Sequence, residues 1–249
     1  MSETPEVRKV RNPGPHNFQM RILQRSKVST VLLYTNSKGQ NVVRKSTRYH
    51  VLHQRERELL KTLGKIDVLD HGFTPKDGFY VEMAFLEGGD LWDRLHGEKA
   101  WKLSLTQILN LILDVIDQLY KLREIGYIHG DLSLENILIH PKKGAAICDL
   151  EDCAPLQASF PLPPRGKAGY AALEIRNVEF QGPYYDRSAC DVYSLGKCLL
   201  FLLSRCSEPK IWRDTGVVEL CRGMTADNWT RRFTLETCLE CIEEIKRNL

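Results

Sequence analysis

Short apolar runs alternate with turn residues in the first third of the chain, from residue 20 to about residue 85. Runs rich in β-branched residues predict strands there, and segments 36–39 and 75–78 predict tight turns between strands. Between residues 49 and 63 the apolar spacing changes to that of a helix. This part of the chain therefore reads as a small β-rich region with a helix inside it.

Beyond Gly88 and Gly89 the pattern becomes mostly helical. A long helix with Ser104 as its N-cap is predicted because apolar residues recur in steps of three and four, namely Leu105, Ile108, Ile112, Val115, Leu119 and Leu122. Strand-like runs follow at 137–139 and 145–148, then a proline-rich stretch at 155–164, an apolar helix at about 190–203 and helices in the last forty residues. We expect an α+β fold of two lobes with a cleft between them, a common location of ligand sites.

Composition narrows the class of protein. The chain has 249 residues, 43% of them hydrophobic, which is enough for one large core or two small lobes. A formal net charge of +3 gives no support for nucleic-acid binding. The longest apolar run, at 198–203, is far shorter than the roughly 20 residues of a membrane span, and no signal peptide is evident. We expect an intracellular protein, cytoplasmic or nuclear, with no nucleic-acid partner and no membrane span.

All eight cysteines lie at or after Cys148, in a chain long enough to form a core without disulfides. We therefore expect reduced thiols. Cys238 and Cys241 form a lone C-x-x-C with no second pair and no histidine at zinc spacing, so we expect no structural zinc there.

One segment carries the candidate chemistry. Asp131 and Asn136 lie five residues apart, and Asp149 follows the apolar run at 145–148. Two of these side chains can converge as oxygen ligands on Mg²⁺, which usually takes only one or two ligands from the protein beside substrate phosphates. The remaining carboxylate can act on a hydroxyl nucleophile. Such an arrangement is typical of phosphoryl transfer.

The same segment resembles the eukaryotic protein kinase family. His129-Gly130-Asp131 resembles the H-R-D of that family, Asn136 its catalytic-loop Asn, and Asp149-Leu150-Glu151 its D-F-G. The resemblance implies that Asp131 and Asn136 are catalytic, that Asn136 and Asp149 bind Mg²⁺, and that His129 is a packed histidine and not the base.

Three later motifs extend the resemblance over nearly the whole chain. Residues 166–174 look like G-T-x-x-Y-x-A-P-E, residues 191–196 look like D-V-W-S-L-G, and residues 232–234 look like a late R-P-T. By resemblance we expect an ion pair between Glu174 and Arg232. The implied architecture is a two-lobed protein-kinase-like domain over residues 21–249, with a small β-rich N-lobe at about 21–86 and a larger helical C-lobe at about 87–249, after a basic leader at 1–20.

The N-terminal residues resemble a nucleotide site. Lys45 is similar to the V-A-I-K lysine, which holds the α- and β-phosphates of ATP, and Glu56 to its helix partner, although the short interval leaves Glu58 as an alternative. The rest of the implied ATP site is Val31, Val43 and Leu138 at the adenine, Met83 as gatekeeper, Ala84 to Leu86 as the hinge, and Asp90 at the ribose. Ordinary core packing explains the three residues assigned to adenine equally well.

The chain departs from the family pattern in its phosphate-binding loop. Gln24, Ser26 and Ser29 stand where three glycines are expected, and side chains hinder the close approach of backbone to phosphates. Nucleotide affinity should therefore be reduced. Gly130 replaces the H-R-D arginine and Lys167 replaces a threonine, so we expect no switch by loop phosphorylation.

Other departures concern catalysis. Ser133 replaces the catalytic-loop lysine, and Glu135 excludes the nearby arginine of tyrosine kinases. Loss of one positioned electrostatic donor costs roughly 10²–10³ in rate. Glu151 either takes part in Mg²⁺ binding or stiffens its turn. The segment before Val217 is short, so substrate recognition should differ from that of other kinases.

Three functions remain open. The leading one is an ATP- and Mg²⁺-dependent protein kinase that phosphorylates Ser or Thr of protein substrates with low or atypical activity. The alternatives are a catalytically impaired pseudokinase that acts as a binding scaffold, and a small-molecule kinase of the aminoglycoside or choline type. We expect a monomer whose partner is a protein substrate or a regulatory protein.

Overall fold

The computed structural model describes residues 20–97, 100–157, 161–181, 185–208, 210 and 216–249. The chain divides into two compact units. The first comprises Met1–Glu58 and Asp67–Phe85, and the second comprises Leu59–Ile66 and Leu86–Leu249. Apart from Met20, the predicted basic leader lies outside the described residues, as do residues 158–160 of the proline-rich stretch and 209 and 211–215 of the shortened segment.

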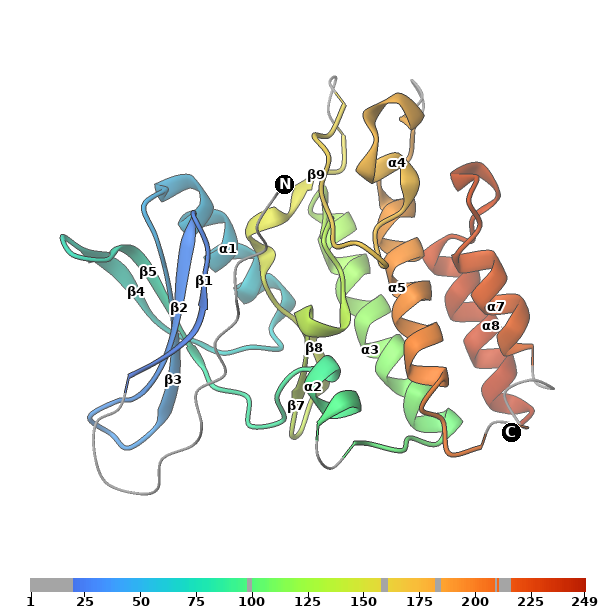
Figure 1. The fold of residues 1–249 in the computed structure, drawn as a ribbon, viewed down its shortest axis with the longest axis horizontal. Helices are drawn as coiled ribbons and strands as arrows, with labels where there is room; N and C mark the ends of the chain where they lie inside the picture. Colours follow the sequence, from blue (N-terminus) through green and yellow to red (C-terminus); the bar gives the residue numbers. More distant parts are fainter. Residues whose placement is uncertain (1–19, 98–99, 158–160, 182–184, 209, 211–215) are drawn as a thin grey trace. The chain divides into compact units, whose positions relative to one another are not determined.

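The first unit is built on an antiparallel sheet, whose described strands follow the order β1-β2-β3-β5-β4 (Figure 1). The strands are β1 (Arg21–Arg25), β2 (Ser29–Thr35), β3 (Asn41–Thr47), β4 (Val68–Thr74) and β5 (Gly78–Ala84), and helix α1 (His50–Leu63) follows β3. The strands and the helix expected between residues 20 and 85 are thus confirmed. β2 begins at Ser29, one residue after the apolar run of residues 28–34 starts, because Val28 belongs to the preceding turn.

Both predicted turns in this unit are present. In the first, Asn36 Oδ1 accepts the backbone N–H groups two and four residues further on, at 3.0 Å each, and Gly39 has a φ of +75°. In the second, Gly78 has a φ of +84°, and a Cβ at this position would lie 2.5 Å from the carbonyl oxygen of Thr47. Glycine is therefore required at residue 78, where β5 starts beside β3.

The second unit is mostly helical, and α3, α5, α7 and α8 pack against one another (Figure 1). Its elements, with η for 3₁₀ helices, are α2 (Leu91–His96), α3 (Leu105–Glu124), β6 (Tyr127–Ile128), η1 (Leu134–Asn136), β7 (Ile137–His140), β8 (Gly144–Ile147), η2 (Leu150–Asp152), β9 (Ala154–Pro155), α4 (Leu173–Arg176), η3 (Val178–Phe180), α5 (Ser188–Leu203), α7 (Val217–Met224), η4 (Trp229–Arg231) and α8 (Leu235–Arg247). Within the described part of the chain, no helix is both long and apolar enough to cross a membrane.

Helix α3 has the N-cap and the buried face that its sequence predicts. Ser104 and Gln107 form a reciprocal capping box, and all six apolar residues of the predicted face are buried. The helix also buries a polar residue, Gln118, whose amide donates to the carbonyl oxygen of Ala145 and accepts from the N–H of Ile147. Gln118 thereby satisfies strand β8 along the edge that faces α3.

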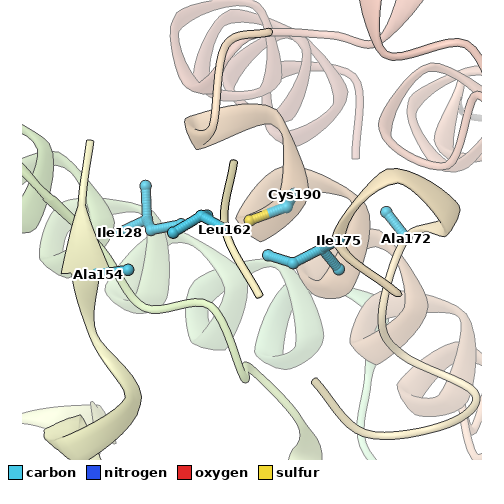
Figure 2. Packing of buried hydrophobic residues seen from close by; sticks show 6 residues of the cluster. All are labelled: Ile128, Ala154, Leu162, Ala172, Ile175 and Cys190. Atoms are coloured by element: carbon cyan, nitrogen blue, oxygen red, sulfur yellow. The ribbon is translucent and has the colours of Figure 1, made fainter. Parts of the chain in front are cut away.

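A small hydrophobic cluster holds the segment between β9 and α4 against α5. It consists of Ile128, Ala154, Leu162, Ala172, Ile175 and Cys190, all of which are buried (Figure 2). These residues come from β6, from β9, from Leu162 and the later residues around α4, and from α5, which lie far apart in sequence. The cluster therefore anchors the described part of the irregular segment around Leu162, which sequence periodicity could not predict.

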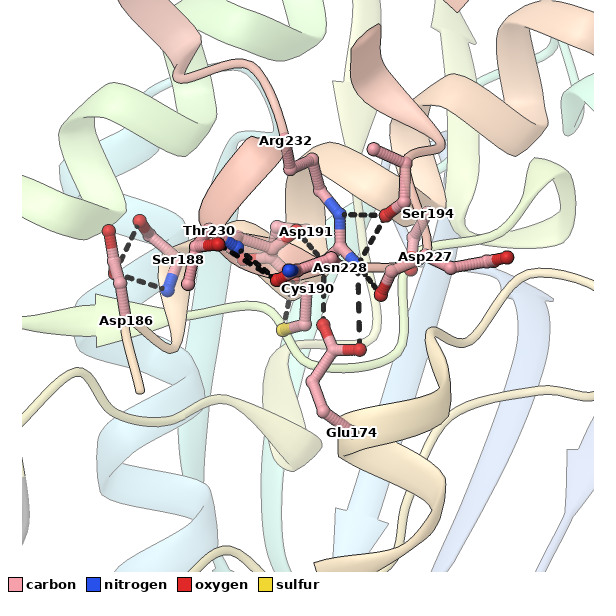
Figure 3. A network of polar contacts seen from close by, with 12 residues as sticks. Glu174, Asp186, Ser188, Cys190, Asp191, Ser194, Asp227, Asn228, Thr230 and Arg232 are labelled. Carbon is pink, nitrogen blue, oxygen red and sulfur yellow. Dashed lines mark hydrogen bonds and ion pairs between the residues drawn. The ribbon is translucent and has the colours of Figure 1, made fainter. Parts of the chain in front are cut away.

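The expected ion pair between Glu174 and Arg232 is confirmed (Figure 3). The two side chains are 3% and 0% exposed, with Arg232 Nη1 2.5 Å from Glu174 Oε1. The guanidinium also donates to the backbone carbonyls of Ala189 and Ala226, at 2.8 Å from Nη1 and 2.9 Å from Nη2. A buried charge pair with this many further hydrogen bonds ties α4 to α5 and to the turn before α8.

All eight cysteines belong to the described residues, and all are thiols. The expectation of reduced cysteines is thus confirmed. Burial raises the pKa of Cys190 and Cys198 and raises the pKa of Cys221 and Cys238 to about 12. These four thiols therefore pack as small apolar side chains.

Candidate functional site

Lys45 of β3 and Glu56 of α1 form a buried ion pair in the first unit. Lys45 Nζ lies 3.0 Å from Glu56 Oε1, and the two residues are 6% and 5% exposed. Glu58, the alternative partner, has a side chain that is 57% exposed and accepts a hydrogen bond from Gln54. Residues two apart on a helix point in very different directions, so only one of the two carboxylates can face β3.

Two of the three residues expected to flank the adenine, Val31 and Val43, share one face of the sheet with Lys45 and Met83. Val31 lies directly opposite Lys45, and Val43 lies directly opposite Met83. Since alternate residues of a strand point to the same side, Val43 and Lys45 also share a face, and all four side chains lie on it. Ala84, the first hinge residue, donates its N–H to the carbonyl oxygen of Asp67, so this N–H is not available to a ligand.

The turn between β1 and β2, where the glycine-rich loop is expected, is closed by a serine. Ser26 Oγ accepts the backbone N–H groups of Val28 and Ser29, at 3.1 and 2.9 Å. The N–H of Ser26 also donates to the carbonyl oxygen of Ser29. Two amide donors that a phosphate-binding loop needs are thus already used within the turn.

Two further residues of the expected nucleotide site meet in the second unit. Asp90 and Leu138 form an isolated antiparallel bridge, and the N–H of Ile139 donates to the carbonyl oxygen of Gly89 at 2.9 Å. Asp90 also caps α2, since its Oδ1 accepts the N–H of Asp93 at 2.8 Å. Burial raises the pKa of Asp90. Leu86, the last hinge residue, is also in this unit and is 7% exposed.

The loop that carries Asp131 is anchored by a buried aspartate of α5. Asp191 accepts the N–H of His129 at 2.7 Å and that of Gly130 at 2.9 Å. His129 is fully buried and its Nε2 lies 3.1 Å from the carbonyl oxygen of Cys148, which confirms a packed histidine. Asn136 Nδ2 donates to the carbonyl oxygen of Asp131 at 2.8 Å and closes the loop.

Asn136 and Asp149 lie at the same end of a β-hairpin. Asn136 directly precedes β7, and Asp149 follows β8 by two residues, while the first residue of β7 is paired with the last of β8. The N–H of Cys148 donates to the carbonyl oxygen of Asn136 at 3.0 Å, which brings the two segments together. Asp149 has a φ of +60°, the one positive φ among the described residues other than glycine. Such backbone strain occurs mostly at functional sites.

Asp131 has the properties of a general base. Burial raises its pKa to about 6, with a further contribution from the negative charges of Asp152 and Asp149. His129 and the backbone N–H of Lys167 act in the opposite direction. Asp131 Oδ1 is buried and has no hydrogen-bond partner among the described residues. A carboxylate with a pKa near neutrality and an unused oxygen is suited to accept a proton.

Comparison with known proteins assigns the chain to a family. Residues 25–214 match the model of the protein kinase domain. The chain belongs to the protein kinase family. It is 30% identical to a MAP kinase-interacting serine/threonine-protein kinase of Xenopus laevis, in a match that covers 60% of this chain and 35% of that protein. It is also 30% identical to a CBL-interacting serine/threonine-protein kinase of Arabidopsis thaliana, in a match that covers 71% of this chain and 40% of that protein. The kinase domain thus spans well under half of each relative.

The sheet with its helix and the helical second unit are the protein-kinase-like fold that the sequence predicts. The oxygen atoms present in this kinase domain fit a hard cation, because Asp149 offers a carboxylate and Asn136 keeps its amide oxygen while its nitrogen donates to Asp131. Among the residues described, no group of three or more His, Cys, Asp or Glu side chains could hold a metal alone.

Sequence reasoning did not predict that two basic residues of this kinase domain, Arg165 and Lys167, lie beside the loop of Asp131. Arg165 donates from Nη1 to the carbonyl oxygen of Asp152 at 2.6 Å, and its Cδ lies 3.2 Å from where a Cβ of residue 130 would be. The space beside Gly130 is therefore filled by an arginine from a later segment. Lys167 Nζ forms an ion pair with Glu135. The absence of lysine and arginine from residues 129–136 indicated a missing charge, but it did not indicate which later residues lie beside the loop.

Proposed function

We propose that the chain is a serine/threonine protein kinase that transfers the γ-phosphate of Mg²⁺·ATP to hydroxyl groups of protein substrates, with low or atypical activity. The names of the related kinases and the match to the kinase domain support the reaction class. The observation that supports it most is the buried pair of Lys45 and Glu56. Burial of a charged lysine costs free energy, which suggests a function for it. Its positive charge is what the phosphates of ATP require.

Each expected residue has a role in this proposal. Lys45 holds the α- and β-phosphates, and Glu56 orients Lys45. Asp131 accepts the proton of the acceptor hydroxyl, and Asn136 with Asp149 would hold Mg²⁺, which neutralises phosphate charge when bound. The residues proposed to contact adenine and ribose are Val31, Val43, Met83, Ala84, Leu86, Leu138 and Asp90.

The low activity follows from two local features. Ser26 uses amide donors of the β1–β2 turn, which reduces the donors left for phosphate. Ser133 offers no charge at the position of the family's catalytic-loop lysine. These features also favour the second candidate, a pseudokinase that binds a regulatory protein. Action inside the cell, in the cytoplasm or nucleus, and as a monomer stays a prediction.

The test is transfer of labelled phosphate from Mg²⁺·ATP to a generic protein substrate by the wild type and by Asp131→Asn. We expect transfer by the wild type and a loss of at least 100-fold in the variant, since general acid–base groups contribute about 10²–10⁴. Asp117→Asn, a surface change on α3, is the matched control. Equal labelling by wild type and Asp131→Asn would contradict the proposal, and nucleotide binding without any transfer would favour the pseudokinase.

A further inference from the structure

The loop around Asp131 has no basic side chain that could meet a phosphoryl group. Residues 129–136 contain neither lysine nor arginine, His129 is fully buried, and Ser133 is 1% exposed. Asp149 and Asp152 add negative charge beside Asp131. The group transferred from a nucleoside triphosphate is anionic, so these carboxylates alone would repel it at the point of transfer.

Lys167 approaches this loop from the segment before α4 and contacts it with both its side chain and its backbone. Its ammonium group forms an ion pair with Glu135 Oε1. Its backbone N–H group acts to lower the pKa of the Asp131 carboxyl group. The side chain of Lys167 remains 48% exposed, so a ligand can reach its ammonium group.

The backbone of Lys167 is held in a tight turn. Its carbonyl oxygen accepts the N–H groups of Tyr170 and Ala171, at 3.1 and 2.9 Å. Gly166 has a φ of +83°, and a Cβ there would lie 2.7 Å from the Cβ of Ala171 and 3.4 Å from the carbonyl oxygen of Gly130. The turn is thus packed against the loop of Asp131, and Lys167 does not depend on a ligand for its position.

Glu135 holds the ammonium group without using all of its donors. An ammonium group has three N–H donors, and the ion pair with Glu135 Oε1 needs one of them. Glu135 Oε2 is buried and has no hydrogen-bond partner in the described part of the chain. Two donors of Lys167 can therefore serve a phosphoryl oxygen while Glu135 keeps the side chain beside the loop.

We propose that Lys167 is a catalytic residue that supplies, from the segment before α4, the positive charge that the loop of Asp131 lacks, and that Glu135 positions it. The inference rests on the proposed function. The acceptor oxygen forms a bond to the γ-phosphorus, the bond from that phosphorus to the β-phosphate oxygen breaks, and its electron pair leaves with ADP. The hydroxyl proton passes to Asp131, and Lys167 stays protonated and donates to the transferred group.

The first test measures kcat and KM for Lys167→Met, with Lys121→Met as the control because Lys121 also pairs with a carboxylate, Asp117, on the surface. We expect Lys167→Met to lower kcat about 10²–10³-fold, as for loss of one oxyanion donor, and to leave the KM for ATP within about threefold. Lys121→Met should change neither. Ser133→Lys in the Lys167→Met background should recover at least tenfold, because it returns a charge to the loop.

The second test does not depend on turnover. Binding of Mg²⁺·ADP is compared with binding of Mg²⁺·ADP plus aluminium fluoride, which imitates the transferred phosphoryl group. Lys167→Met should bind ADP like the wild type and lose the additional affinity from aluminium fluoride. Glu135→Gln should lose part of that affinity, and it should have no further effect when Lys167 is already methionine, as expected for a residue that acts through Lys167.

The outcomes separate the inference from the function on which it rests. If Asp131→Asn abolishes transfer while Lys167→Met keeps kcat and aluminium fluoride affinity within threefold of wild type, Lys167 is not catalytic and the kinase assignment stands. If wild type and Asp131→Asn do not differ, the proposed function fails and the role of Lys167 with it. A lower melting temperature of Lys167→Met, without recovery by Ser133→Lys, would show a structural role and overturn the proposal.

Discussion

Replacement of Arg232 by methionine should destabilise the second unit strongly. The variant removes the cation from a Glu174 carboxylate that is 3% exposed. It also leaves the carbonyl oxygens of Ala189 and Ala226 without the donors at 2.8 and 2.9 Å. Methionine is unbranched and has a comparable volume, so the loss concerns charge and hydrogen bonds more than packing.

The expected magnitude follows from this burial. Removal of one partner from a buried ion pair costs about 3–5 kcal/mol, because the other charge stays in the interior uncompensated. For a domain of this size each kcal/mol lowers Tm by about 2–4 °C, so Arg232→Met should lower Tm by about 6–20 °C. Glu174→Gln keeps an acceptor oxygen for Arg232 and should cost less, about 1.5–3 kcal/mol. Lys121→Met breaks an exposed pair and should cost about 0.5 kcal/mol or less.

Tryptophan fluorescence is a suitable measurement, since all four tryptophans of the sequence lie in the stretch Leu86–Leu249 of the second unit. In thermal and urea unfolding, Arg232→Met should lose the most stability, Glu174→Gln less, and Lys121→Met the least. A Tm of Arg232→Met within 2 °C of wild type would refute the reasoning, because it would mean that the buried pair contributes nothing net.

Three further predictions concern ligand affinity and pH. Ser26→Gly releases the N–H groups of Val28 and Ser29 and should increase the affinity for ATP in calorimetric titrations, and an unchanged or lower affinity would count against a blocked turn. Burial lowers the pKa of His53, so the unfolded chain binds a proton more readily, and the first unit should lose stability as pH falls below about 6.5. Urea titrations by circular dichroism at pH 5 and 7.5 should show this loss, and His53→Gln should reduce it. The pKa of Asp131, raised to about 6, places the acid limb of the kcat/KM profile near pH 6, and a limb near pH 4 would exclude Asp131 as the base.

Local signals in the sequence were sufficient for the regular elements. Helix α3 follows from apolar spacing and from the Ser104 cap, because both depend on residues within one or two turns. Helix α5 begins at Ser188, two residues before its predicted start at about residue 190, since its first turn carries a serine and an alanine that add little to an apolar pattern. The ion pair of Glu174 with Arg232 came from the family resemblance, because no local rule links residues 58 positions apart.

The choice between Glu56 and Glu58 marks the limit of sequence reasoning at the site. Both lie on α1 at a plausible distance from Lys45, and the difference is the direction in which each points once α1 is docked. That docking involves His53, whose Nε2 lies 3.0 Å from the carbonyl oxygen of Tyr80 on β5. It is a tertiary contact, which the spacing of charges does not encode.

The replacements beside Gly130 and Ser133 were also beyond the sequence. Arg165 and Lys167 lie more than thirty residues after these positions, and a basic residue in an irregular segment is usually a solvated charge. Only the fold brings them to the loop. The closure of the β1–β2 turn by Ser26 was missed for another reason, because the substitution of glycine indicated a steric obstacle and not the use of two amide donors.

The placement of the cysteines gives the chain a built-in reporter. The first unit has no cysteine, whereas Cys190, Cys198, Cys221 and Cys238 are buried in the second and have raised pKa values. A thiol reagent should reach these four only when the helical unit opens, since reaction requires both exposure and the thiolate. The rate of labelling at each position then measures the opening of that unit separately from the sheet, and mass spectrometry can follow it in the unmodified protein.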